Sequence, residues 1–255
     1  MAGISIDATL SPEEYVVAVA RGKYPNTSLV TAFGYAAAVG GAVTNANLWE
    51  LATTWTLLAS AQSLELLSSS ASDAVAGTGA RSILVQGLDA NFNQISETVV
   101  PNGTTIVALV NTYRVINNLT VLTAGSTNSN VGNITVRVAS AGAIQAYIVA
   151  AAGASRLGRF TVPAGYVWVV RNFFFLSNGI AGTQASSKIL ATFILSNGVT
   201  IQGLPLTLGN TMSTTITVPD GVAVSATTTL AFSIPSVGIA GLDISGGCSG
   251  VLAKL

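Results

Sequence analysis

The residues that could perform chemistry are few and widely separated in this chain. It contains no histidine, which excludes Ser-His-Asp and Cys-His nucleophile systems, an imidazole acid or base, and His-ligated zinc. Its ten acidic residues are spread thinly over 255 positions, so two carboxylates could act together only through tertiary proximity. We therefore expect the acids to serve in turns, caps and surfaces, and we predict no enzyme and no catalytic residue.

Two glycine-rich motifs resemble functional sites but lack an essential part. Gly77-Thr-Gly79 lacks the Lys and Ser/Thr of a phosphate-binding loop, and we expect it to shape the entry to the next strand. Gly246-Gly-Cys-Ser-Gly resembles a nucleophile elbow, but no base could activate Ser249, so a tight terminal turn is expected. The single cysteine, Cys248, has no disulfide partner and is interpreted as a small structural residue.

Two further groups could bind a ligand. Asp73, Asp89 and Asn91 carry calcium-type oxygens, but the regular alternation of an EF-hand loop is missing, so no metal ligand is predicted. Trp168 and the run Phe173–Phe175 could line a carbohydrate platform. Consecutive aromatic residues in a strand alternate faces, however, so at least part of this cluster should lie in a core or an interface. No cofactor-binding residue is predicted.

The composition is poor in charge. Charged residues make up 8% of the chain, hydrophobic residues 50%, and the formal net charge is +0. A lone globule with so little charge would be poorly soluble, so we expect neighbouring chains to cover much of the surface. Without a Lys/Arg cluster, neither nucleic acid nor an anionic membrane is an expected partner. The first residues lack a secretory signal and the apolar runs are interrupted, so we expect synthesis in a cytosol and no membrane-spanning helix.

The candidate residues lie in segments whose sequences predict short strands. Runs rich in Thr, Val and Ile are punctuated by Gly, Asn and Pro, which is typical of an all-β sandwich or barrel. Residues 1–50 are interrupted by glycines and are predicted to be an irregular arm with one short helix, Pro12–Val19. Residues 51–145 form the first predicted domain, with two strands between Trp49 and Leu67, a hairpin from Arg81 to Val100, and further strands to Val138. A short helix over Leu48 to Leu58 is the alternative to the first of these strands.

Residues 146–255 form the second predicted domain. Phe160-Thr-Val-Pro-Ala-Gly and Ile216-Thr-Val-Pro-Asp-Gly share one pattern, a strand followed by a type I turn with Pro second and Gly fourth. Asn178-Gly179 and Asn197-Gly198 mark additional turns. The fold predicted is thus all-β, with two β-sandwich (jelly-roll-like) domains in tandem after the N-terminal arm.

An ordered series of short segments runs through residues 28 to 138. The segments are Leu48-Trp-Glu, Leu66-Leu-Ser-Ser-Ser-Ala-Ser-Asp, Gly77-Thr-Gly-Ala-Arg, Gln86-Gly-Leu-Asp, Glu97-Thr-Val, Asn102-Gly-Thr-Thr and Asn130-Val-Gly-Asn-Ile-Thr. In this order they resemble a family of structural proteins in tailed bacteriophages. The second half, opening at Phe160, is similar to a weaker pattern of phage virion proteins. One departure is Val100-Pro101, where the proline is expected to end a strand early.

The resemblance implies β-sandwich folds, assembly into homotrimers or larger rings, a place in the virion, and no catalytic residues. Our leading hypothesis is a capsid decoration or cement protein that contacts the major capsid protein. A tail or head-fibre receptor-binding module is the alternative, with Trp168, Tyr166 or the Phe173 cluster stacking on a host glycan. A tail adaptor or tube ring component is a third possibility.

Overall fold

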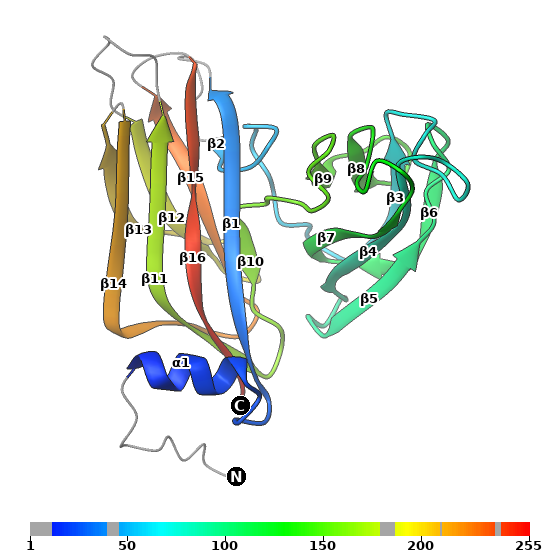
Figure 1. Cartoon of the computed structure of the whole chain (residues 1–255). Helices are drawn as coiled ribbons and strands as arrows, with labels where there is room; N and C mark the ends of the chain where they lie inside the picture. The colour runs from blue at the N-terminus through cyan, green and yellow to red at the C-terminus, as the bar shows by residue number, and fades with distance from the viewer. Residues whose placement is uncertain (1–11, 40–45, 179–186, 210, 238–240) are drawn as a thin grey trace.

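A computed structural model of the chain describes residues 12–39, 46–178, 187–209, 211–237 and 241–255. Within these residues the protein is all-β apart from one helix, α1 (Pro12–Ala20), as the sequence predicted. The strands form four antiparallel sheets, which pack in two pairs around two separate cores. Figure 1 shows the two pairs side by side, and we call them the large unit and the small unit.

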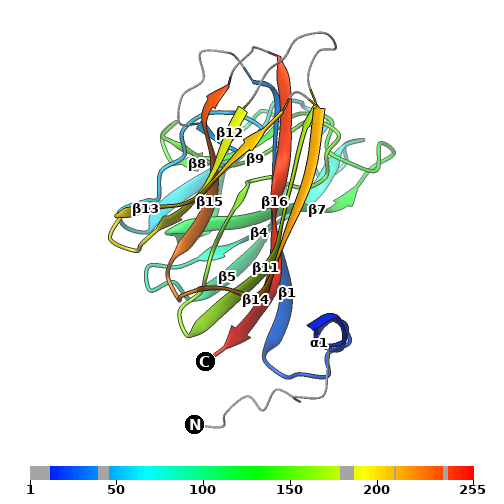
Figure 2. The same ribbon diagram turned by 90° about the vertical axis from the view of Figure 1, so that its left-hand side faces the viewer.

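The large unit consists of two sheets with a common core. One sheet has the order β1 (Thr27–Val39), β16 (Leu242–Lys254), β11 (Tyr166–Asn178) and β14 (Thr211–Val224). The other has the order β10 (Arg159–Thr161), β15 (Thr229–Val237), β12 (Ser187–Ile194) and β13 (Thr200–Leu208), and β2 (Ala46–Asn47) pairs with β15. Trp168 and Phe175 of the first sheet and Phe232 of the second are buried between them, so each sheet contributes one apolar face. Figure 2 shows the whole chain after a turn of 90°, with the large unit toward the viewer.

The small unit has two shorter sheets. One has the order β6 (Val107–Tyr113), β3 (Gln62–Ser68), β8 (Ile134–Val138) and β9 (Ile144–Ile148), and the other the order β5 (Gln94–Val99), β4 (Ala80–Leu88) and β7 (Val115–Ala124). Period-two alternation explains how these strands lie. Ile83 and Val85 of β4 are fully buried and the intervening Leu84 is only half-buried. The predicted hairpin is confirmed as β4 and β5, which pair in register.

The small unit is inserted into the large unit. The side chain of Leu48 belongs to the core of the large unit and that of Trp49 to the core of the small one. The chain returns between Leu157, in the small core, and Val162, in the large core. Two domains in tandem with a boundary at 145/146 were therefore the wrong expectation, because the large unit is assembled from both ends of the chain.

The predicted arm over residues 1–50 is also wrong where the structure describes it. Residues 27–39 form β1, which pairs with β16 from Thr27↔Ala253 to Val39↔Leu242. Residues 1–11 and 40–45 of the predicted arm lie outside the described residues. The sequence of β1 gives no clear strand signal, because Gly34 interrupts it and its partner β16 lies at the other end of the chain. At Gly34 a Cβ would lie 2.1 Å from the carbonyl oxygen of Leu48, so backbones approach too closely there for a side chain.

The segment around Trp55 and the two Pro-x-Gly motifs differ from the structure predicted for them. The run around Trp55 is not a strand, because residues 48–61 form an irregular connection before β3. After β10, Tyr166 N donates to Pro163 O at 3.2 Å and Gly165 has φ +75°, so Gly occupies the third turn position rather than the fourth. Pro219-Asp-Gly is not a turn between strands but lies inside β14, opposite the irregularity between Val170 and Asn172 of β11.

The sequence predicts turns at two asparagine-glycine pairs. Asn197-Gly198 is confirmed as the turn between β12 and β13, with Leu195 N donating to Val199 O at 2.9 Å. For the second, Asn178 ends β11, while Gly179 lies outside the described residues.

Candidate functional site: an uncharged sheet face

The outer face of the sheet β1-β16-β11-β14 carries no charged side chain over three consecutive cross-strand rows. The register places Tyr35, Ser245, Leu176 and Ser213 in one row, Phe33, Gly247, Phe174 and Thr215 in the next, and Thr31, Ser249, Asn172 and Thr217 in the third. We call these twelve residues the uncharged face. They lie opposite the inward-pointing residues of the same strands, such as Cys248 and Phe175, which belong to the core.

Two aromatic rings form the apolar centre of the uncharged face. Phe33 and Phe174 lie on either side of Gly247, and their rings stack with centroids 6.4 Å apart and an interplanar angle of 17°. Because Gly247 has no side chain, the two rings can meet across its strand. Phe33 is 38% exposed and the nearby Leu176 is 47% exposed. Exposed apolar groups gathered on one sheet face are typical of an interaction surface.

Charged groups appear at the edge of the uncharged face. The guanidinium carbon of Arg156 lies 5.2 Å from the ring centroid of Tyr35, and Arg156 Nε pairs with Glu50 Oε1 at 3.0 Å. Burial and the neighbouring carboxylates of Asp243 and Glu50 raise the pKa of Tyr35. Burial also raises the pKa of Glu50, although Arg156 opposes this effect. These contacts link β1 and β16 to both connections between the units.

The carboxylates of Asp73 and Asp89, which the sequence offered as calcium ligands, accept hydrogen bonds from other groups of the protein. Asp73 is fully buried, and its carboxylate accepts from Ser68 Oγ and from the backbone N–H groups of Ala80, Val131 and Gly132. Asp89 accepts from the backbone N–H of Asn91 and from Asn93, as a turn-stabilising aspartate does. No cluster of three or more His, Cys, Asp or Glu side chains occurs in the described ranges.

The glycine motifs form strands and close contacts. Gly77-Thr-Gly79 precedes β4, as predicted, and a Cβ on Gly79 would lie 2.1 Å from Asp73 Oδ1. Gly246 to Gly250 lie inside β16, so the expected terminal turn is wrong. The local preference of glycine for turns is overridden because β16 is flanked by β1 and β11 along this stretch. Cys248 is buried, and burial raises the pKa of its thiol.

Most of the aromatic platform proposed for a glycan lies in the core of the large unit. Trp168 is fully buried, and its ring contacts Phe160 edge-on with centroids 5.1 Å apart. Phe173 and Phe175 contact Phe232 of the opposite sheet in the same edge-on manner. Of the aromatic run, only Phe174 points to the uncharged face, because alternate strand residues face opposite sides.

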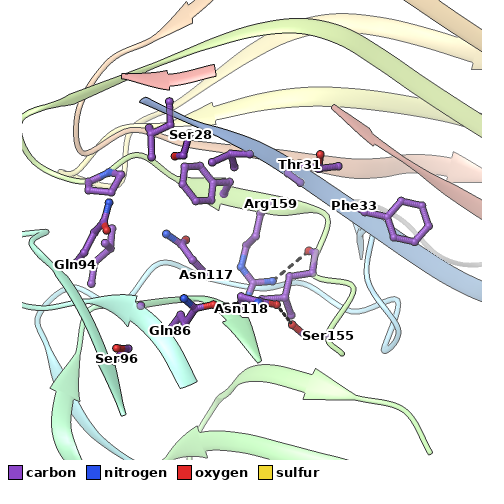
Figure 3. A pocket seen from close by; sticks show the side chains of 18 of the residues that line it. Ser28, Thr31, Phe33, Gln86, Gln94, Ser96, Asn117, Asn118, Ser155 and Arg159 are labelled. Atoms are coloured by element: carbon purple, nitrogen blue, oxygen red, sulfur yellow. Dashed lines mark hydrogen bonds between the residues drawn. The ribbon is translucent and has the colours of Figure 1, made fainter. Parts of the chain in front are cut away.

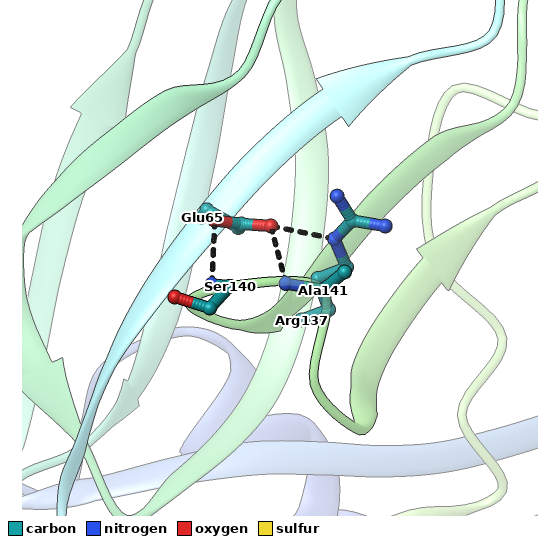
Figure 4. A network of polar contacts seen from close by, with 4 residues as sticks. All are labelled: Glu65, Arg137, Ser140 and Ala141. Atoms are coloured by element: carbon teal, nitrogen blue, oxygen red, sulfur yellow. Dashed lines mark hydrogen bonds and ion pairs between the residues drawn. The ribbon is translucent and has the colours of Figure 1, made fainter.

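The remaining acids of the small unit support its loops. Figure 4 shows Glu65 accepting hydrogen bonds from Arg137 Nε at 2.7 Å and from the backbone N–H groups of Ser140 and Ala141. The bond from Arg137 is the main cause that lowers the pKa of Glu65. Glu97 binds the N–H groups of Val110 and Asn111 in the same way. These carboxylates hold neighbouring strands and loops of the small unit together.

A second feature was not foreseen from the sequence. A cleft of about 650 Å³ lies between the edge strand β1 of the large unit and strands β4, β5 and β7 of the small unit. Figure 3 shows Gln86, Asn117, Asn118 and Arg159 in this cleft. No local sequence signal could have found it, because its walls come from segments that meet only through the insertion.

Comparison with known proteins identifies no relative. No family model, no curated protein and no solved structure matches the chain. Among the described residues, no helix has both the length and the apolar character needed to span a bilayer.

Proposed function

We propose that this chain is a non-enzymatic structural subunit of a bacteriophage virion, a capsid decoration protein that assembles as a homotrimer through its uncharged face. The observation that carries the assembly is the uncharged face itself. A sheet face exposed to water normally carries side chains of both charges. The twelve neighbouring positions of the uncharged face carry none. The virion location is supported by the resemblance of residues 28 to 138 to phage structural proteins.

The architecture of the large unit supports this proposal. We propose that its four-stranded sheet and its five-stranded sheet form a β-sandwich of the jelly-roll type, since successive strands from β10 to β16 pass repeatedly between the sheets. Jelly rolls are frequent in viral capsid and lectin domains. This is a fold-level analogy, and the functional argument depends on the uncharged face.

The size of the sheet face fits a specific interface. The whole sheet, with four strands spaced about 4.8 Å apart and about 3.4 Å rise per residue over 13 residues, presents a flat area of roughly 800 Å², and the uncharged face forms the central part of this area. A standard protein–protein interface buries about 800 Å² per partner. The face is neutral, so a second copy meets it without like-charge repulsion, and rotational symmetry allows three copies to close around one axis.

The oligomer is tested with a charge placed on the uncharged face, in the row next to its aromatic centre. Leu176→Glu puts a carboxylate between the copies, and we expect it to convert trimers into monomers by analytical ultracentrifugation. The matched control is Ile201→Glu, because Ile201 is 50% exposed on β13, away from the uncharged face. A wild-type protein that sediments as a monomer at micromolar concentration, or a trimer that persists in Leu176→Glu, would overturn the proposal.

The location is tested by binding. Purified trimer is expected to bind emptied capsids, and particles lacking the protein are expected to burst at lower temperature. Copurification with tails after heads are disrupted would favour the tail ring function instead. Binding to host cells, with competition against infection, would favour a fibre module.

A further inference from the structure

The cleft between the units is lined by neutral hydrogen-bonding side chains. Gln86 of β4, Gln94 and Ser96 of β5, and Asn117 and Asn118 of β7 face it from the small unit. Its volume, about 650 Å³, falls within the range of about 300–1,000 Å³ that small-molecule sites occupy, often at domain interfaces.

Several of these side chains retain unused hydrogen-bonding capacity. Gln94 and Ser96 make no side-chain hydrogen bond to any described residue. The carboxamide oxygen of Gln86 accepts from Asn118 Nδ2 at 3.2 Å, which leaves the amide N–H₂ of Gln86 available. Asn117, in contrast, is committed, because both ends of its amide bind the backbone of Thr161. The free groups therefore lie toward β4 and β5.

The opposite wall offers backbone groups. β1 is the edge strand of its sheet. Among the strands it pairs with β16, and beyond it Gly34 forms an isolated antiparallel bridge with Leu157. The carbonyl oxygen of Phe33 points away from β16, since it accepts from Gly158 N at 2.9 Å. Alternate residues of an antiparallel strand direct their backbone groups to the same side, so the N–H and C=O of Leu29 and Thr31 also face away from β16, toward the cleft.

Arg159 provides an independent sign of a ligand. Arg159 is only 3% exposed. Its terminal nitrogens donate hydrogen bonds to the carbonyl oxygens of Leu157 and Gln145. Its guanidinium carbon lies 4.0 Å from the ring centroid of Trp55. Arg159 lines the cleft, and its buried Nε has no hydrogen-bond acceptor among the described residues. Buried donors are normally satisfied, so this one calls for an acceptor oxygen that the described residues do not supply. Burial without an anion lowers the pKa of Arg159 to about 9.

We propose that this cleft binds an uncharged saccharide. Sugar hydroxyls are both donors and acceptors, which suits the carboxamide of Gln94, the hydroxyl of Ser96 and the backbone edge at Thr31. A hydroxyl oxygen also supplies the acceptor that Arg159 Nε lacks. The C–H faces of a sugar ring pack against Ile95 and Phe160, which line the same cleft.

The observations favour a saccharide over the two nearest alternatives. A peptide strand added to β1 would need alternating side-chain pockets, whereas the facing wall presents mainly amides and hydroxyls. An acidic ligand would need a cluster of cations, and Arg159 is the single charged residue among those that line the cleft. The site lies apart from the twelve residues of the uncharged face except at Thr31 and Phe33, so it is a function additional to assembly.

The test uses the full chain. We expect it to bind uncharged oligosaccharides of two to five units on a glycan array, and the best of these to give a measurable Kd by isothermal titration calorimetry. The double variant Gln94→Ala/Ser96→Ala should weaken binding at least tenfold. Both residues are exposed, so the fold should persist, as circular dichroism will show. The control is Gln202→Ala, an exposed amide on β13, which should bind as the wild type does.

Four results would overturn the proposal: no uncharged glycan binds, only acidic glycans bind, a peptide competes for the cleft with higher affinity, or the double variant binds unchanged. The outcome is independent of the assembly test, because Leu176 is not among the residues that line the cleft. A wild-type protein that is monomeric but binds saccharide would reject only the assembly proposal, and a wild-type trimer that binds no saccharide would reject only the cleft proposal.

Discussion

Replacing Asp73 should strongly destabilise the small unit. Its buried carboxylate accepts four hydrogen bonds, from Ser68 Oγ at 2.6 Å, Ala80 N at 2.7 Å, and Val131 N and Gly132 N at 2.8 Å each. These donors belong to the end of β3, the start of β4 and the segment before β8. One side chain thus joins segments of both sheets of the small unit.

The magnitude follows from the number of donors left without an acceptor. A hydrogen bond to a charged group contributes about 1.5–3 kcal/mol, and bonds to one shared carboxylate are not additive. We therefore expect Asp73→Ala to cost about 4 kcal/mol, at the upper end for a single substitution. Asp73→Asn keeps the shape but turns one acceptor oxygen into a donor that faces other donors, so its cost should be nearly as large.

Urea denaturation followed by tryptophan fluorescence measures this effect, because Trp49 and Trp55 lie in the core of the small unit. For a slope of about 2 kcal/mol per M, the midpoint should fall by about 2 M. Asp220→Asn, at an exposed position in β14, serves as the control and should leave the midpoint unchanged. The reasoning is refuted if Asp73→Asn behaves like this control.

Three further predictions concern single positions. The bond from Arg137 lowers the pKa of Glu65, so its contribution to stability is complete above the ordinary Glu pKa and is lost as the pH falls through the lowered value; unfolding curves of Glu65→Gln should accordingly show a weaker loss of stability on acidification than wild type. Burial raises the pKa of the Cys248 thiol, so iodoacetamide should label it in urea but not in the native protein, and rapid native labelling would contradict the buried position. Gly34→Ala should lower the melting temperature by several degrees because its Cβ would meet Leu48 O, whereas Gly209→Ala, with no atom within 4 Å of its Cβ, should not.

Much of the local structure could be predicted from the sequence. The alternation in Arg81-Ser-Ile-Leu-Val-Gln and the Asn197-Gly198 pair specify a strand and a turn through interactions between near neighbours, and both are present. The absence of histidine removed whole classes of mechanism without any structure. The low charge indicated a need for covering partners but could not say which face they cover.

The candidate sites depend on pairings that no local pattern encodes. Thr27 pairs with Ala253, so neither the uncharged face nor the insertion can be derived until both ends of the chain are placed in one sheet. The glycines of β16 favour turns locally, and only their neighbours β1 and β11 make them a central strand.

The same distinction applies to individual side chains. Residue type by itself determined that this protein is rich in strands, nearly free of charge and without imidazole chemistry, because propensity, charge and reactivity belong to single residues and their neighbours. Burial belongs to the assembled fold. Trp168 was a plausible surface residue and is in the core, while Arg159 was unremarkable and is buried between the units. Only the tertiary structure decided this, because it determines which distant segments exclude water from each side chain.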